Sequence, residues 1–111
     1  METVNAIIDY ERISIERESF VTARIGVEYG DGSKQGFGGD YCLHNINLKP
    51  PSKTDLAGYH MAKIMQCAGV TMWHQLVGKP IRVTSDGSRI LAIGHITKEI
   101  WYCPSGELKD D

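Results

Sequence analysis

Apolar and polar side chains alternate over residues 21–29, where valine, alanine, isoleucine and tyrosine take every second position. A period of two residues is typical of a β-strand with one buried face. The preceding residues 7–15 are rich in β-branched and aromatic side chains, and their alternation slips near Ile8, which indicates a β-bulge. Residues 16–19 are predicted to form the turn that joins these two strands.

A Gly-Asp-Gly-Ser sequence at residues 30–33 predicts a second tight turn, because Asp-Gly supplies the positive-φ positions of a hairpin. A third strand is expected over residues 34–43. Residues 44–53 are expected to be loop, since Pro50-Pro51 excludes a helix and a regular strand.

Helical spacing begins at about residue 55 and ends at residue 68, after a cap at Ser52 or Thr54. The apolar stripe of this helix contains Leu56, His60, Ile64 and Cys67. Gly69 is a typical C-terminal stop, and residues 72–76 predict a second, very short helix.

The closing segment returns to sheet, with a strand around residues 81–83, a turn at 85–88 and a long final strand over 89–101. We therefore expect an α+β fold in a single domain, residues 1–111: an N-terminal antiparallel three-stranded sheet, one helix plus a short helix, and a C-terminal β-hairpin. The final strand is apolar on both faces, and one helix layer covers only one face of a sheet. This favours a homo-oligomer, a dimer or larger.

The composition excludes several classes of protein. A net charge of −2 argues against bulk nucleic-acid binding and against anionic membranes, both of which favour a basic surface. No segment approaches the run of about 18 apolar residues that spans a membrane, and the first residues lack the pattern of a signal peptide. Three cysteines without framework spacing indicate reduced thiols and a cytoplasmic location.

No catalytic or metal-binding motif is present. The four histidines and three cysteines show neither Cys-x-x-Cys nor His-x-x-x-His spacing, and the carboxylates are scattered. We therefore predict no catalytic residue, no metal site and no cofactor.

The segment Gly36-Phe37-Gly38-Gly39 is more informative, because three glycines in four residues cost backbone entropy. They indicate either a bulge or bend that exposes Phe37, or the close approach of a ligand or subunit. Trp73 and Trp101 are core residues or flat surfaces for stacking a base. Arg82, Arg89, His95 and Lys98 are either a solvated face or phosphate ligands.

Two stretches, residues 35–41 and 92–96 with Trp101 beyond, are similar to those of small phage and prophage proteins. In size and element order the chain also resembles the first Thoeris anti-defence family. That resemblance implies an oligomer in the host cytoplasm that binds cyclic ADP-ribose signals or cyclic oligonucleotides without cleaving them.

The function we expect is therefore a phage protein that sequesters a small cyclic nucleotide. The expected ligand-binding residues are Phe37, Gly38, Gly39, Trp73, Arg82, His95 and Lys98. The alternative is an inhibitor that binds a host defence protein directly, as anti-CRISPR proteins do. A small phosphodiesterase would need metal ligands or a general base, which the sequence does not reveal.

Overall fold

The computed structural model describes residues 2–39, 44–45 and 56–107. The strands are β1 (Glu2–Glu16), β2 (Phe20–Tyr29), β3 (Lys34–Phe37), β4 (His44–Asn45), β5 (Pro80–Ser85), β6 (Ile90–Gly94) and β7 (Trp101–Tyr102). The helices are α1 (Leu56–Ala68), the 3-10 turn η1 (Trp73–Gln75) and the one-turn α2 (Pro104–Glu107).

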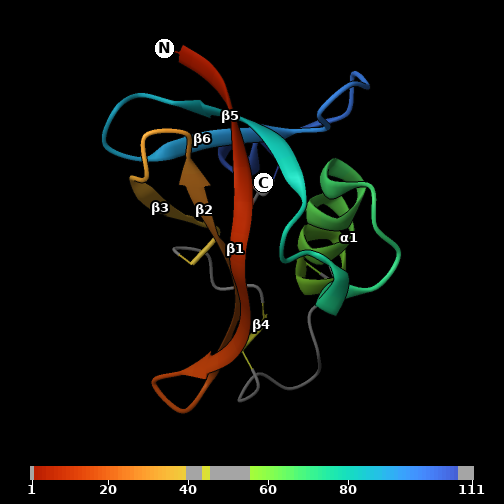
Figure 1. Ribbon diagram of the computed structural model, residues 1–111. Coiled ribbons are helices and arrows are strands. Elements are labelled where there is room, and N and C mark those ends of the chain that lie inside the picture. The colour runs from red at the N-terminus through yellow and green to blue at the C-terminus, as the bar shows by residue number, and fades with distance from the viewer. Residues whose placement is uncertain (1, 40–43, 46–55, 108–111) are drawn as a thin grey trace.

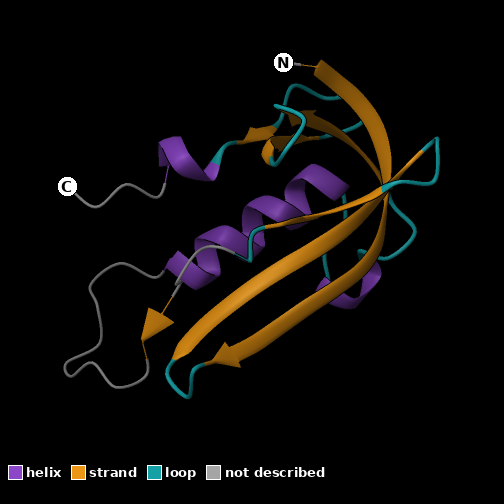
Figure 2. Cartoon of the chain, turned by 90° about the vertical axis from the view of Figure 1, so that its left-hand side faces the viewer, coloured by secondary structure: helices purple, strands orange, loops and turns teal. Residues whose placement is uncertain are grey.

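All the described strands belong to one antiparallel sheet, in the order β3-β2-β1-β5-β6-β7, with β4 paired to β2. The sheet curls, so that β3 contacts β6 across the open side and the Phe37 and Tyr102 rings lie 6.1 Å apart. Helix α1 packs beside this curled sheet (Figures 1 and 2).

The predicted fold class is wrong, because the N-terminal and C-terminal strands form one sheet. The first strand was predicted to start at Ile7. In the structure β1 starts at Glu2, and its first six residues pair with β5. Polar and apolar residues are mixed in this first part of β1, so its hydrophobic pattern is too weak to predict a strand. The separate three-stranded sheet and closing hairpin are therefore replaced by a single curved sheet.

The predicted long final strand is also wrong. The strand β6 ends at Gly94, and the chain turns back before β7 begins. In this turn the His95 amide donates to the Ile100 carbonyl at 2.9 Å. The short helix predicted at residues 72–76 is only the 3-10 turn η1. The strand β4 lies within the segment expected to be loop, and the third strand ends at Phe37. Residues 40–43, predicted to extend it, and the predicted helix caps lie outside the described residues.

Several local predictions are confirmed. The bulge in β1 occurs between Ile8 and Tyr10, and the turns at 30–33 and 85–88 join the expected strands. Gly69 ends α1 with φ +72. The buried residues of α1 are three members of the predicted stripe, His60, Ile64 and Cys67.

The core lies between the concave face of the sheet and α1. It is formed mainly by aliphatic residues of β1, β2, β5 and β6, with Phe37 and Tyr102 at the two edges of the sheet. No helix in the described part of the chain is long and apolar enough to cross a membrane.

Candidate functional site

The glycine cluster of β3 lets the chain's own side chains approach closely. Gly38 has φ +94, and a Cβ there would lie 2.8 Å from both the Ala23 carbonyl oxygen and the His60 Nε2. Phe37 is only 4% exposed and stacks on His60, with ring centroids 6.3 Å apart. Phe37 is therefore a core residue, and its ring face is covered.

His60 is the buried polar residue at the centre of this contact. Its Nε2 lies 3.0 Å from the Ala23 carbonyl oxygen, which only accepts, so Nε2 carries the proton and donates. Its Nδ1 then accepts from the Tyr102 hydroxyl at 2.6 Å. Burial lowers the pKa of the His60 imidazole, opposed by the hydrogen bond to Ala23.

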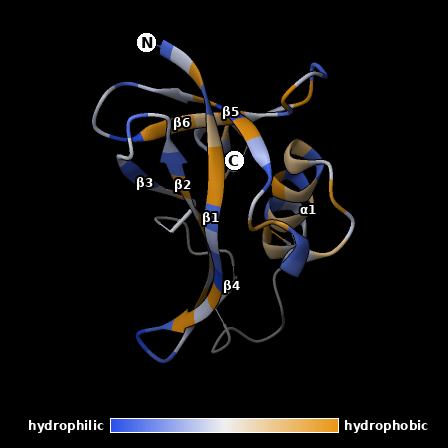
Figure 3. Cartoon of the chain, in the orientation of Figure 1, coloured by the Kyte–Doolittle hydropathy of each residue, from blue (hydrophilic) through white to orange (hydrophobic). Residues whose placement is uncertain are grey.

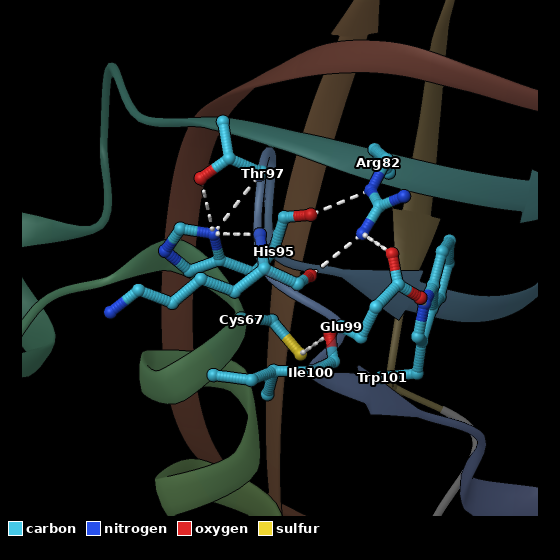
Figure 4. A network of polar contacts seen from close by, with 8 residues as sticks. Cys67, Arg82, His95, Thr97, Glu99, Ile100 and Trp101 are labelled. Carbon is cyan, nitrogen blue, oxygen red and sulfur yellow. Dashed lines mark hydrogen bonds and ion pairs between the residues drawn. The ribbon is translucent and has the colours of Figure 1, made fainter.

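Arg82, on β5, shapes the loop between β6 and β7, which contains two of the predicted ligand residues, His95 and Lys98 (Figure 4). Its Nε donates to the His95 carbonyl at 2.6 Å, and one terminal nitrogen donates to the Lys98 carbonyl at 2.7 Å. The same nitrogen lies 3.4 Å from a Glu99 carboxylate oxygen, and the guanidinium carbon lies 4.6 Å from the centroid of the Trp101 ring. The donors of Arg82 are thus largely used within the chain.

His95 has a similar structural role. Its Nδ1 accepts from the backbone amides of Thr97 and Lys98, both at 3.1 Å. Lys98 itself is exposed. The structure therefore places the Arg82 side chain, from β5, against the loop that contains His95 and Lys98.

Trp73 and Gly39, like Phe37 and Gly38, lie apart from that loop. Trp73, in η1, is half-buried and packs against the core, and its indole nitrogen is buried without a hydrogen-bond partner in the described structure. Gly39 faces Arg24: a Cβ there would lie 3.0 Å from the Arg24 Cδ. Neither of the two hollows described below is lined by these two residues or by Arg82, His95 or Lys98.

A different surface combines an exposed aromatic ring with arginines. Tyr10 follows the β1 bulge and lies opposite Gly26, and a Cβ on Gly26 would lie 2.0 Å from the Tyr10 ring. A Cβ on Gly36 would lie 3.7 Å from the Tyr10 hydroxyl. The ring therefore rests on glycine backbone across β2 and β3, yet the residue stays 40% exposed.

Two arginines flank this ring. Arg24 has its guanidinium carbon 6.0 Å from the Tyr10 ring centroid, and Arg12 lies directly opposite Arg24 in the register. Like charges in directly opposed strand positions destabilise a sheet. Arg24 has no hydrogen-bonded or ion-paired partner among the described residues, and its Nε is buried without an acceptor.

A comparison of Arg24 with Arg82 shows which of the two guanidinium groups is available to bind an anion. In both places an aromatic ring covers a glycine beside an arginine: Trp101 over Gly94 near Arg82, and Tyr10 over Gly26 near Arg24. The carbonyl groups of a loop satisfy Arg82, whereas Arg24 lacks such acceptors in the described structure. We call the surface formed by Tyr10, Arg12 and Arg24 over the glycines the Tyr10 face.

A hollow of about 770 Å³ lies at one end of the sheet, and Tyr10, Arg12 and Arg24 are not among the residues that line it. Lys34, which pairs with Asp9 at 3.2 Å, is one of its lining residues. The other walls come from the start of β1, the β2–β3 turn and the β5–β6 turn. A second hollow of about 590 Å³ adjoins it and shares Asn5, Tyr29 and Gly30.

Chemically, the Tyr10 face suits a ligand with both a planar ring and a negative charge. The exposed tyrosine ring offers a stacking surface, and the forked N–H donors of an arginine guanidinium match the geometry of a phosphate group. Sequence reasoning missed this surface because Tyr10 was counted in an apolar run. The break in alternation near Ile8 could have indicated it, because a bulge there moves Tyr10 and Arg12 to the face of the sheet opposite to Ile8.

No known protein family, no curated protein and no solved structure matches this chain significantly.

Proposed function

We propose that the protein binds a small cyclic nucleotide on the Tyr10 face and sequesters it without chemical change. The observation that carries this proposal is the exposed Tyr10 ring beside Arg24, a cation without an acceptor in the described structure. Base stacking on tyrosine and phosphate binding by arginine are the two interactions that a nucleotide offers together.

The charge of the protein bears on the size of the ligand. A net charge of −2 disfavours a long polyanion, which gains affinity from many distributed cations. A compact ligand with one or two phosphates suits two arginines better than a polymer does.

The backbone beneath Tyr10 leaves its ring accessible as a stacking surface. The ring lies over Gly26 of β2 and near Gly36 of β3, so no side chain at those two positions displaces it.

Isothermal titration with a panel of cyclic nucleotides tests the proposal, with a single-stranded oligonucleotide and an unrelated anion, citrate, as the comparison ligands. We expect heat from at least one cyclic nucleotide and recovery of that nucleotide unchanged after the protein is heat-denatured. Recovery of a cleaved product would contradict sequestration. Binding of the oligonucleotide alone, or of nothing, would contradict the proposed ligand class.

Substitutions locate the contact. Arg24→Gln should weaken binding about ten- to a hundredfold, the usual effect of losing one charge-assisted hydrogen bond. Tyr10→Leu should also weaken it, because the flat stacking surface is lost. The control Arg89→Gln removes an equal charge from the exposed β5–β6 turn and should bind as the wild type does.

A further inference from the structure

The outer half of β1 has one unpaired edge. On one side β1 pairs with β2 as far as Glu16, but on the other side its register with β5 ends at Ile7. Two further bonds join Ile8 to Gly78 and Lys79. Beyond them, no described strand lies against this side of residues 10–16, and the β1–β2 hairpin extends from the molecule as an arm (Figure 2).

Two large apolar side chains are exposed on this arm. Ile13 is 50% and Ile15 is 59% exposed, and parts of the outer end of β1 are coloured hydrophobic in Figure 3. Natural edge strands are usually shortened, covered or protected by charge, because an open edge pairs readily with another strand. An open edge with exposed isoleucines therefore indicates a partner.

The backbone groups of these isoleucines are oriented for pairing. The Glu16 carbonyl accepts from the Ser19 amide, so it points into the hairpin. Backbone groups of successive residues in an antiparallel strand point alternately to the two sides. The amide and carbonyl groups of Ile15 and Ile13 therefore point away from β2, to the open edge.

We propose that a second copy of this chain pairs with this edge, antiparallel to it, with Ser14 of each copy opposite the other. In this register Ile13 faces Ile15 of the second copy, and Arg12 faces Glu16 of the second copy. Each contact occurs twice about the two-fold axis. The two curved sheets then join into one through their β1 strands.

The charge sequence of β1 selects this register. In this register each Arg12 faces an opposite charge, Glu16 of the second copy. A shift by two residues in one direction places Ile15 opposite Glu11, and a shift in the other direction places Ile13 opposite Arg17, which lies in the turn beyond β1. The partner that matches the edge in both shape and charge is therefore the chain itself.

Sedimentation velocity of the full chain tests the charge pairing. The wild type should sediment as a dimer of 12.3 kDa subunits. Arg12→Glu and Glu16→Arg should each weaken dimerisation about tenfold, since each replaces two attractive pairs by two repulsive ones. The double variant Arg12→Glu/Glu16→Arg should restore it, whereas the control Arg89→Glu should have no effect.

A cysteine on the two-fold axis tests the register. Directly opposed, non-hydrogen-bonded strand residues have Cα atoms about 4.5 Å apart, within disulfide range. Ser14→Cys should therefore form a covalent dimer on mild oxidation. The control Thr3→Cys, in the part of β1 that pairs with β5, should not.

A monomeric wild type, or a dimer that both single charge reversals leave intact, would overturn the proposal, as would equal cross-linking of the two cysteine variants. Circular dichroism of each variant separates loss of pairing from loss of fold. The dimer edge shares Arg12 with the proposed nucleotide site, and Arg24→Gln separates the two proposals, because it should weaken nucleotide binding and leave the dimer intact.

Discussion

At the scale of single residues, His60 couples the stability of the core to pH. Its neutral form donates to the Ala23 carbonyl and accepts from the Tyr102 hydroxyl, and protonation would replace that acceptor by a donor. Because burial lowers its pKa in the folded state, the unfolded chain binds the proton more readily. The stabilisation by neutral His60 is fully present above the pKa of this histidine in the unfolded chain, and it is lost as the pH falls below that pKa.

We therefore expect the free energy of unfolding to decrease as the pH falls below about 6.5, measured by urea denaturation at a series of pH values. In His60→Phe this decrease should be smaller. That variant should also lose about 1–3 kcal/mol at neutral pH, because both hydrogen bonds are removed. The exposed-residue control His74→Gln should keep the wild-type profile, and an unchanged profile in His60→Phe would refute the assignment.

A pair of glycines separates backbone strain from packing. Gly38 and Gly87 have φ values of +94 and +96, but only Gly38 has neighbours that a Cβ would meet. Gly87→Ala should cost about 1–2 kcal/mol, the effect of a left-handed backbone alone. Gly38→Ala should cost clearly more in thermal or urea unfolding. Equal losses would mean that His60 and Ala23 move aside without cost.

At the scale of elements, Arg82 holds the β6–β7 loop by its bonds to the His95 and Lys98 carbonyls. Arg82→Gln should destabilise the protein by about 1.5–3 kcal/mol, the usual value for hydrogen bonds to a charged group. Amide hydrogen exchange should show faster exchange in residues 95–99 than in the wild type. If exchange there is unchanged, the loop is held by other contacts.

The sequence predicts elements well where a local pattern defines them. The alternation in β2, the Asp31-Gly32 turn and the Gly69 stop each depend on neighbouring residues only. The final strand was wrong because its apolar run continues through Gly94 and His95. The turn there depends on Arg82, which lies on another strand, so local reading does not reveal it.

At the scale of the whole molecule, the fold depends on the long-range pairing of the first residues of β1 with β5. Those residues carry no strong apolar pattern, and their pairing closes the sheet into one curved layer. The candidate site depends on the same long-range structure. The sequence drew attention to residues 36–39, but only the paired register places Tyr10 over Gly26 and Arg24 beside Gly39.

The location of ligand binding is the central claim, and NMR titration of the ¹⁵N-labelled protein with the cyclic nucleotide that binds best tests it most directly. We predict that the largest amide shifts cluster at Tyr10, Arg12, Arg24, Gly26 and Gly36. The β6–β7 loop, with His95 and Lys98, should shift little, because Arg82 and His95 are already bonded within the chain. Shifts centred on residues 95–99 and absent from the Tyr10 face would contradict the account.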